Sequence, residues 1–217
     1  MKTRALLFLA ILTTMLTAGC SSVYYGAMEK VGIHKRDILV DRVDDARKSQ
    51  EDAKKQFASA LDQFIAITKV DAGGDLESKY NKLSDGLKRS EERAKAVNER
   101  IASVSDVAEA LFSEWKKELS QYSDAGLRSQ SEAQLKQTRA RYEDLMRTMR
   151  AAAARMDPIL VKFRDQVLFL KHNLNARAVA GLSATSVTLQ SDVSGLIADM
   201  EKSIAEADAF INSMKTQ

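Results

Sequence analysis

The sequence of 217 residues is poor in the residues that interrupt helices and in those that cross-link small folds. It contains one proline, nine glycines and one cysteine, and aromatic residues make up 6% of it. So few turn-forming residues argue against a β-sandwich or barrel, in which turns recur every ~8–12 residues. A single cysteine excludes a disulfide within the chain and a zinc site made of several thiolates.

Motifs for catalysis are also absent from the sequence. It has no glycine-rich phosphate loop and no G-x-S-x-G turn, the backbone devices of nucleotide hydrolysis and of serine hydrolases. The two histidines, His34 and His172, stand outside any Glu-x-x-His pair, the pattern with which helical bundles bind two irons. We therefore expect no enzyme activity, no cofactor and no metal site.

The segment 1–19 has the order of a bacterial secretory signal. Lys2 and Arg4 precede an apolar run from Ala5 to Leu16. That run is too short for a bilayer span, which needs about 20 residues, but it has the length of a signal-peptide core. Without this segment 31 basic residues face 30 acidic ones, so the mature chain is close to neutral and we expect no nucleic-acid partner.

The only cysteine, Cys20, directly follows this signal. Leu16, Ala18 and Gly19 precede it and Ser21 follows, as in lipoproteins whose cysteine is lipidated before the signal is removed. Cys20 is thus the expected lipid-bearing first residue of the mature chain, with two or three acyl chains giving a stable membrane anchor. Ser21, rather than an aspartate, favours the outer membrane over the inner one. The alternative is an ordinary signal peptide followed by a chance cysteine.

Long stripes of apolar residues at helical spacing fill the rest of the chain, which predicts an all-α protein. We expect a lipidated tether at 20–26 and a single helical coiled-coil domain at 27–217. The first helix is predicted over 27–70 and ends at Gly73 and Gly74, after which Asp75 caps the next helix.

The second segment, 76–122, keeps a heptad pattern over its whole length, with Ala94 and Ala108 allowing the first helix to approach closely. A third segment resumes after Gly126 and ends near Gly181, and a last helix covers 186–214. Pro158 either splits the third segment, with Asp157 as cap, or kinks it. The prediction is an elongated antiparallel bundle, or coiled-coil hairpin, of four or five long helices.

Two polar clusters are candidate interaction sites. The first is a basic patch near the membrane anchor that would contact anionic headgroups or an envelope partner: Lys35, Arg36 and Arg42. The alternative for it is a salt-bridged helix face, because His34, Asp37, Asp41, Asp44 and Asp45 lie among these cations. The second cluster would line a pocket or a partner surface: Arg164, Asp165, Lys171, His172, Asn173, Asn175 and Arg177. The alternative for it is a satisfied polar network at a helix end.

Three stretches of the chain resemble a family of uncharacterised proteobacterial lipoproteins. They are residues 20–43 (CSSVYYGAMEKVGIHKRDILVDRV), 106–115 (DVAEALFSEW) and 163–177 (FRDQVLFLKHNLNAR). The family is known as a domain of unknown function, so the resemblance implies an envelope location and a helical fold but carries over no active site.

The expected function is therefore that of a lipid-anchored helical scaffold or adaptor on the periplasmic face of the outer membrane. Its partners would be the membrane, through the covalent lipid, and an envelope protein or a second copy of the chain. The alternative is a carrier or chaperone that holds a lipid or an apolar polypeptide between helices lined by Met146, Met149, Met156 and Phe163.

Overall fold

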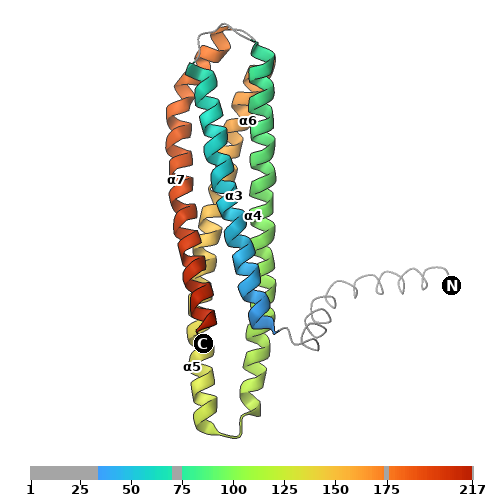
Figure 1. Cartoon of the computed structure of the whole chain (residues 1–217), viewed down its shortest axis with the longest axis vertical. Helices are drawn as coiled ribbons and strands as arrows, with labels where there is room; N and C mark the ends of the chain where they lie inside the picture. Colours follow the sequence, from blue (N-terminus) through green and yellow to red (C-terminus); the bar gives the residue numbers. More distant parts are fainter. Residues whose placement is uncertain (1–33, 70–74, 174–175, 217) are drawn as a thin grey trace, which may run out of the picture.

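The computed structural model describes residues 34–69, 75–173 and 176–216, and these residues form an all-α bundle without a strand. The helices, labelled as in Figure 1, are α3 (Lys35–Lys69), α4 (Leu76–Glu118), α5 (Ala125–Ala154), α6 (Met156–His172) and α7 (Ala176–Lys215). The predicted signal and tether, residues 1–26, lie outside the described residues.

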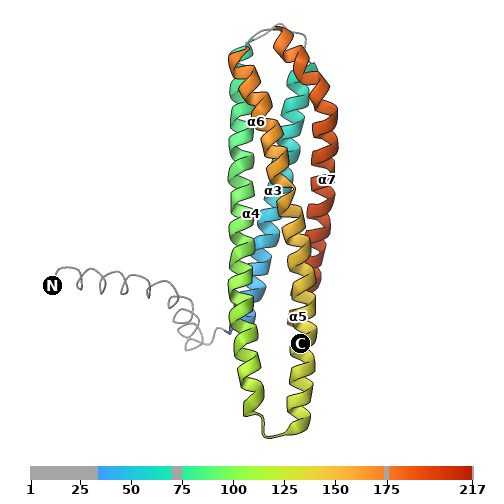
Figure 2. The same cartoon turned by 180° about the vertical axis from the view of Figure 1, so that it is seen from behind.

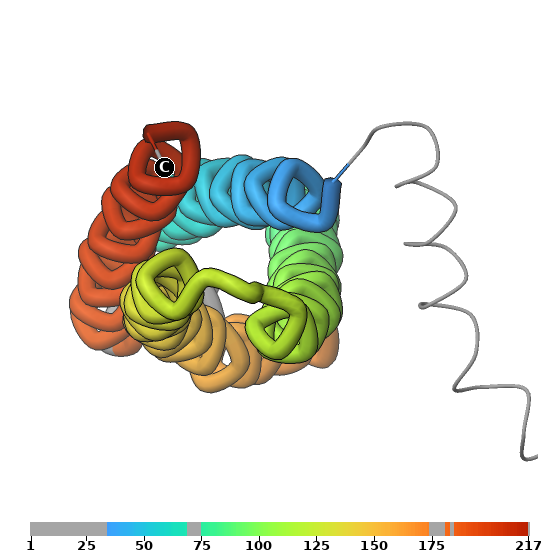
Figure 3. Tube along the Cα trace, turned by 90° about the horizontal axis from the view of Figure 1, so that it is seen from below, coloured from blue at the N-terminus to red at the C-terminus, as the bar shows by residue number. Residues whose placement is uncertain are grey.

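The helices run alternately up and down as four rods, because α5 and α6 follow one another along a single rod (Figures 1 and 2). Seen from below, the rods form a square in which α3 lies between α4 and α7, and the α5–α6 rod closes the opposite corner (Figure 3). The antiparallel bundle predicted from the sequence is confirmed, and so is the pairing of its first two helices.

The predicted second helix begins where its cap signal places it. The side chain of Asp75 accepts a hydrogen bond from the backbone N–H of Glu77, which satisfies one of the amides left free at a helix start. The heptad positions in the middle of α4 are buried, among them Leu83, Ala94, Val97 and Val104. The helix ends at Glu118, a turn earlier than expected, and a short 3-10 helix, Leu119–Gln121, leads into the next turn.

The single proline marks the junction of α5 and α6, but neither alternative for it was quite correct. The helix is interrupted at Arg155, whose backbone stays in the right-handed helical region, so the rod bends without reversing. Pro158 has no N–H for the carbonyl of Ala154, four residues earlier, and its ring would clash with that carbonyl. Asp157 lies inside α6 and does not cap it.

The predicted boundary between the third and the last helix is wrong. α6 ends at His172, and α7 begins at Ala176 instead of continuing the third segment to Gly181. Gly181, the predicted stop, lies within α7, and an added Cβ there would be at an ordinary contact distance, 3.9 Å, from Phe169 of α6. A glycine inside a helix costs about 1 kcal/mol, which the packing of a 40-residue helix outweighs.

The core runs along the inside of all four rods. Its largest buried side chains include Phe57 and Phe64 of α3 and Leu189, Leu196 and Met200 of α7. One polar pair interrupts it, where Ser203 of α7 donates a hydrogen bond to the side-chain oxygen of Gln50 on α3, at 2.9 Å. Such a buried pair favours one alignment of α3 against α7, since sliding either helix would leave both groups unpaired.

Candidate functional site

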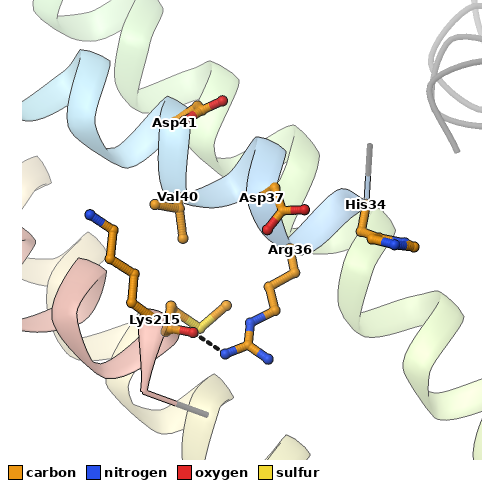
Figure 4. A pocket seen from close by; sticks show the side chains of 7 residues that line it. His34, Arg36, Asp37, Val40, Asp41 and Lys215 are labelled. Atoms are coloured by element: carbon orange, nitrogen blue, oxygen red, sulfur yellow. Dashed lines mark hydrogen bonds between the residues drawn. The ribbon is translucent and has the colours of Figure 1, made fainter. Parts of the chain in front are cut away.

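The candidate site lies at the end of the bundle where α3 begins and α7 ends. A hollow of about 640 Å³ lies there between the first two turns of α3 and the last turn of α7 (Figure 4). Its lining is mostly charged: His34, Arg36, Asp37, Val40, Asp41, Met214 and Lys215. The hollow is the part of the described surface nearest in sequence to the expected lipid anchor.

Arg36 joins the two helices that meet at this hollow. Its guanidinium donates a hydrogen bond to the backbone carbonyl of Met214, as Figure 4 shows. The last carbonyls of a helix lack a partner within the helix and carry a partial negative charge, which a cation offsets. Arg36 therefore fixes the end of α7 against the start of α3, across 178 residues of sequence.

The three cations predicted as a membrane-proximal basic patch each have a partner. Lys35 is buried and pairs with Glu114 of α4 at 2.9 Å, while Arg36 binds the end of α7. Arg42 pairs with Asp45, one turn further along α3, at 3.5 Å. The three side chains thus contact three different parts of the bundle, which favours the salt-bridged face over a common basic patch.

A ladder of ion pairs continues from the site along the α3–α7 contact. Arg47 lies between Asp44 and Asp208, and Lys54 lies between Glu51 and Glu201. The pKa of the Asp44 carboxyl is lowered, chiefly because Lys48 donates a hydrogen bond to it, with Arg47 adding to the effect against partial burial. The pKa of Glu51 is lowered as well, mainly because Lys54 donates a hydrogen bond to its carboxylate.

We expect these carboxylates to contribute to the loss of stability in acid. Because their pKa values lie lower in the folded than in the unfolded chain, their contribution is complete above the unfolded values, about 4, and is lost as the pH falls through the folded ones. The variant Asp44→Asn/Glu51→Gln should lose less stability than the wild type between pH 6 and pH 3, measured as the urea midpoint. The difference should be modest, since the pairs are partly exposed. An equal decrease in both proteins would contradict the expectation.

The second predicted cluster does not converge on one pocket. Arg164 reaches across to Glu91 of α4, whereas Asp165, Lys171 and His172 point into solvent. Asn173 ends α6, and its side chain donates a hydrogen bond to the carbonyl of Phe169 at 2.9 Å. Asn175 lies outside the described residues, and Arg177 belongs to α7 but its side chain is not among those that the structure describes.

Asn173 is a polar group with a hydrogen-bond partner at a helix end, whereas Arg164 pairs with Glu91 from the middle of α6. Sequence reasoning missed the partners that lie far along the chain from these clusters, Glu91, Glu114 and Met214. The sequence pattern indicates only a solvated charge at Glu91, and nothing in the local pattern indicates which carbonyl a distant arginine will bind. Only the alignment of the four rods brings these groups together.

Within the described ranges, no group of His, Asp and Glu side chains is arranged to hold a metal ion. In the same part of the chain, no helix is both long and apolar enough to cross a membrane. The methionines that would line a carrier, Met146, Met149 and Met156, are buried in the core together with Phe163.

Of the comparisons with known proteins, the one with family models identifies the family of this chain. Neither the curated proteins nor the solved structures gave a match. A family model described as a protein of unknown function, DUF2959, matches residues 24–214, which is nearly the whole chain after the expected lipidation site. The chain therefore belongs to the DUF2959 family of proteins of unknown function.

Proposed function

We propose that this protein is a lipid-anchored helical scaffold or adaptor of the bacterial cell envelope, held on the periplasmic face of the outer membrane by lipid on Cys20. The observation that carries the proposal is the place of Cys20, directly after a signal-like segment and a short stretch of chain before His34, where the described bundle begins. A lipid there would attach the membrane to one end of the bundle.

The dimensions of the bundle suit a spacer. α4 alone has 43 residues and is therefore about 65 Å long, and two rods pack against it, α3 on one side and α5–α6 on the other. Charged side chains cover the outer faces of the bundle, and many of them form ion pairs. A rigid rod with a polar surface can present a partner-binding face tens of ångströms from its anchor.

The packing of the core favours this function over that of a carrier. Met146, Met149, Met156 and Phe163 are each at most 3% exposed, so the side chains that would contact an apolar ligand already contact one another and the rest of the core. A ligand could enter between these helices only by separating them, and the separation would expose buried apolar surface.

Crosslinked co-purification from native membranes tests the proposal. A photoreactive residue replaces Val161, which is exposed on α6, and the matched control replaces Leu196, which is buried on α7. A scaffold should give a reproducible envelope-protein adduct, or an adduct with a second copy, from position 161 and none from position 196. A stoichiometric lipid or small molecule without any protein adduct would contradict the scaffold and support the carrier.

A further inference from the structure

The hairpin between α4 and α5 extends beyond the rest of the bundle. The ion pair of Lys35 with Glu114, and the bond from Arg36 to the carbonyl of Met214, show that α3 begins and α7 ends at the level of residue 114. In Figure 1, α4 and α5 continue below both of these ends. Residues 115–121 alone add about 10 Å. We call residues 115–137 the projecting tip.

The projecting tip is a rigid two-helix structure. The indole N–H of Trp115 on α4 donates a hydrogen bond to the hydroxyl of Ser131 on α5 at 2.8 Å, and Leu119 is buried between the helices. At the turn, Asp124 caps α5 by accepting a hydrogen bond from the backbone N–H of Leu127. Whatever lies at the end of the tip is therefore held in a fixed position.

The end of the tip exposes apolar and basic side chains together. Tyr122 is 42% exposed and Leu127 is 55% exposed, although most other large apolar side chains of the described bundle are at least partly buried. Lys116, Lys117 and Arg128 are exposed beside them, and none of the three has an ion-pair partner among the described residues. An amphipathic aromatic ring, an aliphatic side chain and long cationic ones are characteristic of the membrane–water interface.

The chain that precedes the bundle limits how far this end can be from an anchor. Between Cys20 and His34 the chain can span at most about 50 Å even when fully extended, because each residue adds no more than ~3.6 Å. The opposite end of the bundle lies a further ~50 Å away, the length of the 35 residues of α3. The projecting tip and the tethered start of α3 share the end that is nearer to a lipid on Cys20.

We infer that the projecting tip contacts the lipid headgroup layer of the membrane that carries the anchor. Tyr122 and Leu127 enter the interface, while Lys117 and Arg128 lie against anionic headgroups. Four basic residues face three acidic ones in the tip, so the apolar pair contributes the larger part of the contact. The inference rests on the proposed anchor, and it makes the tip a second support that orients the rod against the membrane.

Labelling at single cysteines tests this contact in the full-length protein. If Cys20 carries lipid as a thioether, the wild type takes up no thiol-reactive fluorophore, so Leu127→Cys and Tyr122→Cys can each be labelled at one site. The matched control is Val187→Cys, which is 73% exposed on α7 towards the opposite end. Each protein is reconstituted into phosphatidylethanolamine–phosphatidylglycerol vesicles that contain brominated acyl chains. We expect severalfold stronger quenching at positions 127 and 122 than at position 187.

The other outcomes separate failure of the tip contact from failure of the anchor. If the protein binds the vesicles but the labels at positions 127 and 122 are quenched no more than the label at 187, the inference is overturned and the anchor stays intact. Quenching at 187 instead would place the opposite end on the membrane and would also overturn it. If the label at position 127 is protected in native membranes but not in the vesicles, the inference is overturned as well, and the tip contacts a protein partner instead. A wild type that takes up one label would show a free Cys20 and would overturn the proposed anchor itself.

Discussion

Replacing Cys20 by alanine is expected to abolish incorporation of labelled palmitate and to leave the chain as its unprocessed precursor. The diacylglycerol is attached to the thiol, and the signal is removed only after that step, so loss of the sulfur blocks both events. The cell extract should therefore contain a species longer than the wild-type mature chain by the whole segment that precedes position 20. Palmitate labelling and intact mass measure the two effects independently.

The Cys20→Ala chain does not measure how strongly the lipid binds the membrane, because its uncleaved signal could itself hold it at the inner membrane. A chain in which a conventional cleavable signal precedes residue 21 should be found in the soluble periplasmic fraction. One acyl chain gives only marginal membrane binding, with an association constant of about 10⁴ M⁻¹, whereas two or more give stable anchoring. The expected change in membrane partition is therefore several orders of magnitude.

Ser21→Ala is the matched control for the lipidation site. It alters the neighbouring residue and keeps the thiol, so palmitate incorporation and processing should both remain. Wild-type protein without palmitate, or a Cys20→Ala chain processed as efficiently as the wild type, would mean that the segment 1–20 is an ordinary signal with a chance cysteine. The proposed scaffold would then have no covalent connection to the membrane.

Local signals predicted those parts of the fold that depend on neighbours in sequence. The alternation of apolar residues in 76–118 and the cap at Asp75 define α4 almost completely, because both depend on contacts within a few residues. The boundary near residue 173 was misplaced because one glycine was taken as the end of a helix. Gly181 lies inside α7, a helix of 40 residues whose packing against the bundle outweighs the cost of that glycine.

For the candidate site, the sequence predicted which cations lie near one another along α3 but not the groups that they contact. The sequence placed Lys35, Arg36 and Arg42 together, but their partners lie on α4, on α7 and on α3 itself. Which helices become neighbours depends on the alignment of four rods over the whole chain. The projecting tip illustrates the same limit, since it exists only because α4 and α5 extend past the ends of α3 and α7.

Replacing Phe163 by alanine is expected to lower the free energy of unfolding by about 3–5 kcal/mol, the usual cost of removing a buried phenylalanine. Phe163 is 3% exposed, and its ring meets that of Phe64 edge to face, with 6.0 Å between centroids and an interplanar angle of 89°. The pair joins α6 to α3 across the diagonal of the square. Urea unfolding followed by circular dichroism measures the change.

Phe169→Ala is the matched control, because it makes the same substitution in the same helix at a side chain that is 45% exposed. Its cost should be below about 1 kcal/mol, since less apolar surface is removed from contact and no closed cavity is formed. Similar losses for the two variants would show that the diagonal contact does not hold the rods together. A large loss for Phe163→Ala alone would mean that opening the core is costly, and a rod that resists opening can keep its length between an anchor and a partner.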